Sequence, residues 1–251
     1  MINIVFLLLA LLAEILGTIG GFGSSVFFVP FANFYFDFHT VLGLTALFHL
    51  SSNFSKIFLF RKGLDKKLIL NIGIPSIIFV IIGGVLSKYI DSLFLQIGLS
   101  VFLISFSLLF LIRKELVFKT GKRETWIGGS LSGFLAGILG TGGAIRGLTM
   151  AAFNLEKSVF VATSAAIDMG IDITRSMVYF LNGYLNKTTL IYIPFLLIIG
   201  FIGTFIGKYI LSKISQVNFK IISLVLILII GIITAYYTFF EFKTMLYFKN
   251  D

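Results

Sequence analysis

Long runs of apolar residues with few charges dominate the pattern along this chain. Four stretches of 20 or 21 residues contain no Asp, Glu, Lys or Arg: residues 68–87, 92–112, 188–207 and 221–240. A helix needs about 20 apolar residues to cross a hydrocarbon core about 30 Å thick. Strands of a membrane β-barrel would instead alternate apolar and polar residues over about ten positions. The pattern therefore predicts an all-α integral membrane protein with several transmembrane helices.

The composition agrees with this prediction and excludes other classes of protein. Of the 251 residues, 58% are hydrophobic and 12% are charged, and the mean hydropathy is +1.05. Soluble domains carry about 25% charged residues, so the chain lacks the polar surface of a soluble or disordered protein. No basic residue precedes the first apolar run, which argues against a cleaved signal peptide. The absence of cysteine excludes disulfides and thiolate metal sites, and no cofactor is expected.

The chain contains an internal repeat with an offset of 119 residues. The matched positions include Gly21 with Gly140, Gly23 with Gly142, His49 with Asp168, Asn53 with Asp172, Lys56 with Arg175, and Pro75 with Pro194. An ordered series of matches over most of each half is typical of a duplicated chain. We therefore predict two transmembrane repeats, residues 1–112 and 125–251, joined by a cytoplasmic linker at residues 113–124.

Each repeat begins with an apolar segment whose length does not fit one crossing. Residues 2–36 would form a straight helix of about 50 Å, but glycines interrupt the segment at residues 17–23. Residues 125–153 are interrupted in the same way at residues 140–143. Because glycine weakens a helix, each repeat is predicted to be a glycine-broken helical hairpin followed by three transmembrane helices. The whole chain would then have 8–10 membrane segments.

The basic residues predict the orientation of the two repeats. A hairpin plus three crossings changes sides once, so equivalent loops should face opposite compartments. The loop at residues 61–67 carries four basic residues, whereas its counterpart at 182–187 carries one. Under this topology thirteen of the twenty basic residues lie on one side and four on the other, which predicts that the first side is cytoplasmic. The net charge of +9 then reflects the basic residues that orient the protein in the cell membrane. Nucleic-acid binding is not expected. Two inverted repeats with broken helices are typical of transporters.

The two glycine segments are similar to a known signature. GFGSSVFFVP at residues 21–30 resembles the glycine-rich signature of the sulfite exporter TauE/SafE family, and GTGGAIR at residues 140–146 resembles a second copy. The length, duplication and hydropathy are also similar, so the resemblance covers nearly the whole chain. It implies a multi-pass transporter of small sulfur-containing anions such as sulfite and organosulfonates. The chain departs from the signature at Ser24 and Ser25, where glycines are usual, and at Thr149, where the second copy lacks the proline.

The glycine breaks provide candidate contacts to an anion. Backbone N–H groups at helix N-termini carry partial positive charge and suit an anionic ligand. The alternative is close helix packing, which we expect for Gly129, Gly133, Gly203 and Gly207. At the breaks substrate binding is favoured, and the candidate residues are Gly21, Gly23, Ser24, Ser25, Gly140, Gly142 and Gly143.

Arg146 follows the second break and is the one charged residue between Thr125 and Leu155. An arginine at membrane depth normally faces the protein interior or a cavity. Its planar guanidinium can bind an oxyanion through two hydrogen bonds, so we predict that Arg146 contacts the substrate. The alternative is a structural ion pair with an acid such as Glu14, Asp168 or Asp172.

Two polar stripes with the same spacing occur in the two repeats. They consist of His49, Asn53 and Lys56 in the first repeat and Asp168, Asp172 and Arg175 in the second. Residues at i, i+4 and i+7 share one helical face, so the stripes are candidate walls of a substrate pathway. Interhelical hydrogen bonding is the alternative, and Lys56 is close enough to a loop to extend toward water. Either acid could couple transport to H⁺ or Na⁺, whereas Glu14 is expected to pair with a buried cation outside the site.

The sequence thus predicts a multi-pass carrier in which two halves rock around a midplane anion site. Its partners would be a small anionic substrate, the lipid bilayer and a coupling ion; import, export and any oligomeric state fit the pattern. An intramembrane enzyme is the alternative from another class. Against it, Asp168 and Asp172 lie on one helix instead of facing each other, and the two histidines form no H-E-x-x-H motif. A channel or scaffold is a further alternative, and saturable anion flux would exclude it.

Overall fold

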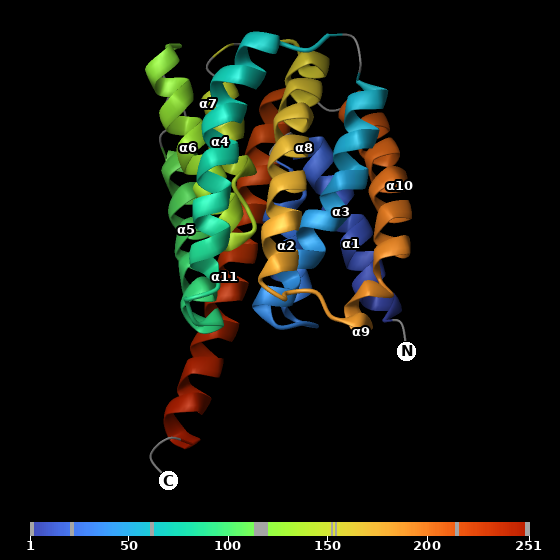
Figure 1. Cartoon of the computed structure of the whole chain (residues 1–251). Coiled ribbons are helices and arrows are strands. Elements are labelled where there is room, and N and C mark those ends of the chain that lie inside the picture. The colour runs from blue at the N-terminus through green and yellow to red at the C-terminus, as the bar shows by residue number, and fades with distance from the viewer. Residues whose placement is uncertain are drawn as a thin grey trace.

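The computed structural model describes residues 3–20, 23–60, 63–112, 120–151, 153, 155–213 and 216–248. Within these ranges the regular structure is entirely helical (Figure 1). The helices are α1 (Ile4–Gly20), α2 (Ser25–Asn33), α3 (Phe38–Leu59), α4 (Lys66–Ser87), α5 (Ser92–Ile112), α6 (Lys122–Leu139), α7 (Gly143–Ala151), α8 (Lys157–Leu181), α9 (Lys187–Leu190), α10 (Ile193–Leu211) and α11 (Gln216–Phe248). The predicted all-α class is confirmed.

Acidic side chains mark the start of two long helices. Asp37 accepts a hydrogen bond from the backbone N–H of Thr40 at the start of α3, and Asp65 accepts one from Leu68 at the start of α4. Such caps satisfy backbone donors that the first turn of a helix leaves without partners. The two residues therefore fix the positions at which α3 and α4 begin.

Three helices of the described chain, α4, α5 and α10, are long and apolar enough to cross a membrane. The first two coincide with predicted stretches. The expected stretch at 188–207 is wrong at its start, because a turn at residues 191–192 separates the short helix α9 from α10. Pro194 then lies in the first turn of α10, where its missing N–H costs no intrahelical bond. The expected stretch at 221–240 lies inside α11.

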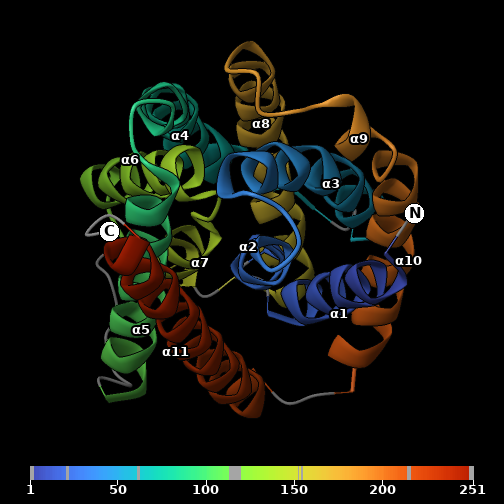
Figure 2. The ribbon, with the colours of Figure 1, turned by 90° about the horizontal axis from the view of Figure 1, so that it is seen from below.

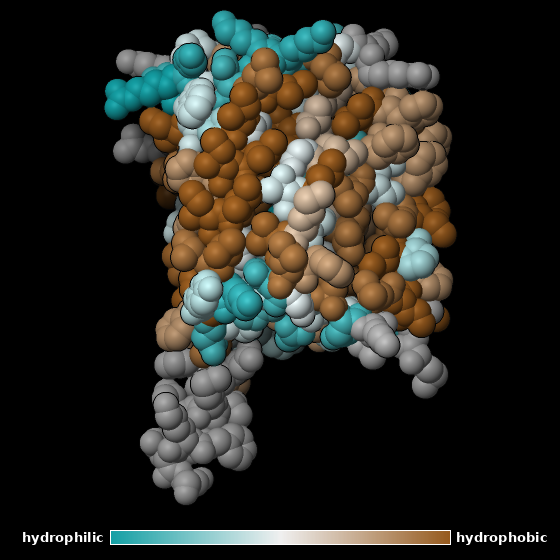
Figure 3. All heavy atoms as spheres, viewed as in Figure 1, coloured by the Kyte–Doolittle hydropathy of each residue, from teal (hydrophilic) through white to brown (hydrophobic). Residues whose placement is uncertain are grey.

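The surface agrees with a lipid environment. Apolar side chains form a broad band between two hydrophilic ends (Figure 3). Residues of α10 such as Ile198, Phe201 and Phe205 are about half exposed, which would be unfavourable in water and suits hydrocarbon. The N- and C-termini lie at the same end of the bundle (Figure 1). The protein is therefore a membrane protein.

The most extensive helix contacts join helices from different predicted repeats. α4 packs along α6, α10 along α1, α5 along α11, and α3 along α8. Seen along the bundle, these pairs surround α2, which is almost wholly buried (Figure 2). The two parts of the sequence are interleaved in space and share one interior.

Glycines allow two of these contacts to be close. A Cβ atom on Gly133 of α6 would lie 2.1 Å from the carbonyl oxygen of Ser76 on α4. A Cβ atom on Gly129 of α6 would lie 2.5 Å from Ile72 of α4, and Cβ atoms on Gly203 and Gly207 of α10 would lie 2.7 Å from Glu14 and Thr18 of α1, respectively. A side chain would force these helices apart, so the packing role predicted for all four glycines is confirmed.

Candidate functional site

Both predicted helix breaks are present. In the first, α1 ends at Gly20 and α2 begins at Ser25; in the second, α6 ends at Leu139 and α7 begins at Gly143. Gly23 has φ +88° and Gly140 has φ +74°, values in the left-handed region that favours glycine. Gly21, a predicted site residue, lies outside the described residues.

The two breaks meet in the interior. Ser25 Oγ, at the start of α2, donates a hydrogen bond to Thr141 Oγ1 in the second break at 3.3 Å. A Cβ atom on Gly23 would lie 3.8 Å from both Arg146 Nη2 and Asp168 Oδ2. The backbone of the first break therefore lies next to the charged residues that follow the second.

Arg146 makes an ion pair, as the alternative interpretation predicted. Its Nη1 and Nη2 atoms donate to the two carboxylate oxygens of Asp168, the latter at 2.5 Å. Its Nε donates to Ser164 Oγ at 3.0 Å, and the residue is only 1% exposed. Ser164 and Asp168 both belong to α8, so this helix holds the guanidinium group of Arg146 in place.

The two polar stripes face each other across the α3–α8 contact. Asp172 accepts hydrogen bonds from Arg175 Nε at 2.7 Å and from Asn53 Nδ2 at 2.6 Å. His49 Nδ1 lies 3.8 Å from the same carboxylate. One pair of matched positions of the two repeats, Asn53 and Asp172, is thus in direct contact.

Arg175 and Tyr179 donate hydrogen bonds to carbonyl groups at the end of α6. Arg175 Nη1 donates to the carbonyl oxygen of Gly140 at 2.8 Å, and the Tyr179 hydroxyl donates to that of Gly137 at 2.7 Å. Carbonyl groups in the last turn of a helix have no intrahelical partners and favour positive charge. Tyr179 was not among the residues predicted from the sequence; its position four residues after Arg175, on the same helical face, is the available signal.

Glu14 pairs with a buried cation, as expected. Its Oε1 lies 2.8 Å from Lys56 Nζ. Hydroxyl groups surround the carboxylate: Thr18, Ser52 and Thr204 donate to Oε1, and Ser24 donates to Oε2 at 2.5 Å. Lys56 is only 6% exposed, so the expectation that it extends toward water is wrong: the buried carboxylate of Glu14 and the hydroxyl of Ser52, 2.6 Å away, hold its ammonium inside.

His49 lies between the Glu14–Lys56 pair and the Asp172–Arg175 pair. Ser24 uses its single hydroxyl proton for Glu14, and its oxygen lies 3.0 Å from His49 Nε2. Ser24 must then accept, so Nε2 carries a proton and donates it. The opposite nitrogen of the ring faces Asp172. Polar contacts therefore run from Glu14 in the first repeat to Asp172 in the second.

The remaining glycine candidates serve the backbone of the second break. A Cβ atom on Gly142 would lie 1.9 Å from the carbonyl oxygen of Ser132, and Ser132 Oγ donates to the carbonyl of Gly142 at 2.8 Å. Gly143 is the first residue of α7. These contacts make Gly142 a close-packing position between α6 and the break.

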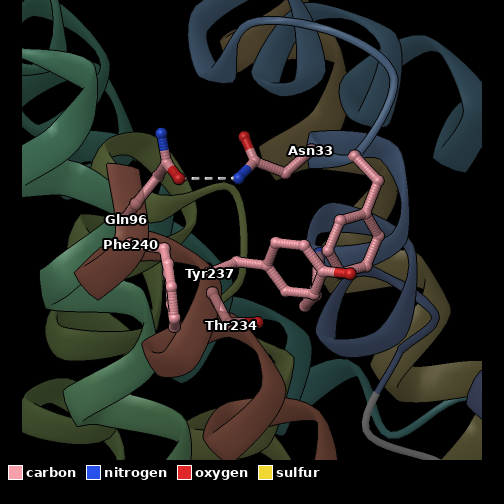
Figure 4. Close-up of a pocket in the computed structure, with 7 residues that line it drawn as sticks. Asn33, Gln96, Thr234, Tyr237 and Phe240 are labelled. Atoms are coloured by element: carbon pink, nitrogen blue, oxygen red, sulfur yellow. Dashed lines mark hydrogen bonds between the residues drawn. The ribbon is translucent and has the colours of Figure 1, made fainter. Parts of the chain in front are cut away.

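Two hollows lie in the described part of the bundle, and one of them is beside the first break. A small cavity, about the size of one water molecule, borders the ion pairs and is lined by Gly17, Thr18, Gly23, Lys56, Val161, Ser164, Ala165 and Asp168. A larger hollow lies between α2, α5 and α11 (Figure 4). There Asn33 Nδ2 donates to Gln96 Oε1 at 2.8 Å, and Phe34 and Tyr237 pack nearby without any charged residue in the lining. Neither amide was among the residues predicted from the sequence.

Comparison with known proteins identifies the family. No curated protein matches the chain. The sequence profile described as "Sulfite exporter TauE/SafE" matches residues 6–234, nearly the whole chain and both glycine breaks. The chain therefore belongs to the sulfite exporter TauE/SafE family.

Proposed function

We propose that this protein carries sulfite, an organosulfonate or a related small sulfur oxyanion across the cell membrane by alternating access. Membership of the family makes it a membrane anion transporter, and the choice of substrate and mechanism is our proposal. The observation that carries it is the position of the break at Gly23 beside the Arg146–Asp168 pair. Discontinuous helices meeting at charged groups inside a membrane bundle are the usual construction of a transporter site.

The course of the helices supports two inverted repeats. In Figure 1, α1 starts at the end of the bundle that holds the N-terminus, whereas α6, its counterpart, starts at the opposite end. α5 and α11, the last helices of the two repeats, also run in opposite directions (Figure 1). With the basic loop at residues 61–67 on the cytoplasmic side, both termini would face outward in a multi-pass arrangement.

Arg146 is proposed to bind the substrate. It is the cation nearest to Gly23, and its guanidinium can hold two oxygens of an oxyanion as it now holds two oxygens of a carboxylate. Arg175, by contrast, is committed to Asp172 and to the end of α6. Arg146 would therefore act on the substrate and Arg175 on the fold.

Flux into proteoliposomes tests this proposal. Purified protein would be offered sulfite, thiosulfate, sulfoacetate, taurine and non-sulfur anions, with protein-free liposomes as the background. We expect saturable flux of at least one sulfur oxyanion and its loss in Arg146→Ala. Non-saturable flux would indicate a channel, and no flux of any anion would overturn the proposal.

A double variant separates binding from folding. Arg146→Ala leaves the Asp168 carboxylate buried without its partner, which is itself destabilising. Arg146→Ala/Asp168→Ala removes both charges, so its fold should be restored while transport stays absent. Recovery of transport in the double variant would show that Arg146 is only a structural partner of Asp168.

A further inference from the structure

We infer that Asp168 competes with the substrate for Arg146, and that each anion enters this site together with one proton taken up by Asp168. The inference rests on the proposed function. It assigns the coupling ion and the residue that carries it, which the sequence left open between two acids and two ions.

The guanidinium donors of Arg146 that could bind an anion already bind the carboxylate of Asp168. Nη1 and Nη2 donate to the two oxygens of Asp168, and Nε donates to Ser164. A carboxylate and a sulfur oxyanion offer the same two acceptor oxygens to a guanidinium fork. An incoming anion must therefore take the place of the Asp168 carboxylate.

Asp168 has fewer partners than Asp172 and can therefore separate from its cation more easily. Asp172 is 2% exposed and is fixed by Arg175 and Asn53. The Asp168 side chain is 15% exposed, and in the described part of the chain its carboxylate accepts hydrogen bonds from Arg146 alone. It also borders the small cavity beside Gly23.

The buried charged groups around Asp168 balance one another. The titratable and charged groups around Asp168 are Arg146 on α7, Lys56 and His49 on α3, Asp172 and Arg175 on α8, and Glu14 on α1, which binds Lys56. Three cations are matched by three carboxylates, so one added monovalent anion, such as hydrogensulfite or a sulfonate, leaves one excess negative charge. An unpaired buried charge is strongly unfavourable. A proton on Asp168 removes it.

The step is therefore an exchange of partners at Arg146. The proton comes from water on the side to which the site is open and forms an O–H bond with a carboxylate oxygen of Asp168. The substrate anion then accepts the hydrogen bonds of Nη1 and Nη2. When the site opens to the other side, the anion and the proton leave together and Asp168 pairs again with Arg146.

Sulfite uptake into proteoliposomes at different pH values tests the inference, with Asp168→Asn as the matched variant. The titration of sulfite itself affects both proteins equally, so only their difference reports on Asp168. Where Asp168 is ionised, the wild-type KM should rise about tenfold per pH unit relative to the variant, because one proton is bound with each anion. A pH gradient should drive greater accumulation of sulfite by the wild type than by Asp168→Asn.

A binding measurement covers the case in which the variant does not complete the transport cycle. Asp168→Asn lacks the competing carboxylate, so sulfite should raise its thermal midpoint in detergent more than that of the wild type at pH 8. Gradient-driven accumulation by Asp168→Asn equal to that of the wild type would overturn the inference, as would loss of sulfite binding in the folded variant. Wild-type transport without any response to the pH gradient would overturn the inference and leave the proposed function intact. No saturable anion flux by the wild type would overturn both.

Discussion

Ser25 and Thr141, 116 residues apart in the sequence, share a hydrogen bond of 3.3 Å that joins the two glycine breaks directly. A hydrogen bond between neutral groups contributes about 0.5–1.5 kcal/mol to stability. In a double-mutant cycle, Ser25→Ala and Thr141→Val should show a coupling energy of that size or slightly less. Equilibrium unfolding in mixed micelles measures it.

A serine that does not join the breaks is the control for this cycle. Ser100 Oγ donates to the carbonyl of Ile97 in its own helix, so Ser100→Ala should show no coupling to Thr141→Val. Additive effects of Ser25→Ala and Thr141→Val would mean that the contact between the breaks contributes nothing.

Gly23 and Gly183 allow backbone strain to be separated from the site. Both have φ near +80°, where an L-residue costs about 1–2 kcal/mol. Nothing lies within 4 Å of a Cβ atom on Gly183, whereas the methyl group of Gly23→Ala would lie 3.8 Å from Arg146 and Asp168. We expect similar losses of thermal stability in the two alanine variants but a raised KM for sulfite only in Gly23→Ala. Equal KM values would remove Gly23 from the site.

The Glu14–Lys56 pair should behave as a unit. Removing one partner of a buried ion pair costs about 3–5 kcal/mol because the other charge stays buried. Glu14→Gln or Lys56→Met alone should therefore reduce the yield of monodisperse protein in detergent. The double variant should recover most of that yield, since the hydroxyl groups of Thr18, Ser52 and Thr204 can also bind an amide. A double variant as unstable as the worse single variant would contradict this.

The end of α6 offers a comparison between two side chains. Tyr179→Phe removes one hydroxyl and leaves the carbonyls near Arg175, so a loss of about 1–3 kcal/mol is expected. Arg175→Lys should cost more, because an ammonium on a shorter stem cannot reach both Asp172 and Gly140 as the fork does. Thermal midpoints in detergent rank the two variants, and the reverse order would contradict the capping role of Arg175.

Local pattern was enough to predict the all-α class, two of the long helices and the breaks. Uncharged runs near 20 residues gave α4 and α5, and the glycine density gave the breaks at Gly23 and Gly140. The failure at the start of α10 is also physical. Tyr192 and Pro194 stand at a helix start that apolar character alone does not reveal.

The pairing of charges depended on tertiary contacts that spacing along one chain does not contain. The sequence placed three cations and three acids inside the membrane, but the partner of Arg146 was a choice among three acids. The hydroxyl groups of Ser52 and Thr204 escaped notice because such residues are common in membrane helices and carry no periodic signal. Their role appears only when α1, α3 and α10 are brought together.

The interleaving of the two repeats has a consequence for how the chain is made and how it moves. α1 is synthesised well before α10, along which it packs. The carboxylate of Glu14 can meet Lys56 of α3 early, but Thr204 of α10 reaches it late. The contacts between α1 and α10 therefore form only after α10 has been made. A division of the bundle at the linker would separate α1 from α10 and α4 from α6. In the proposed transport cycle we therefore expect each moving body to contain helices of both repeats.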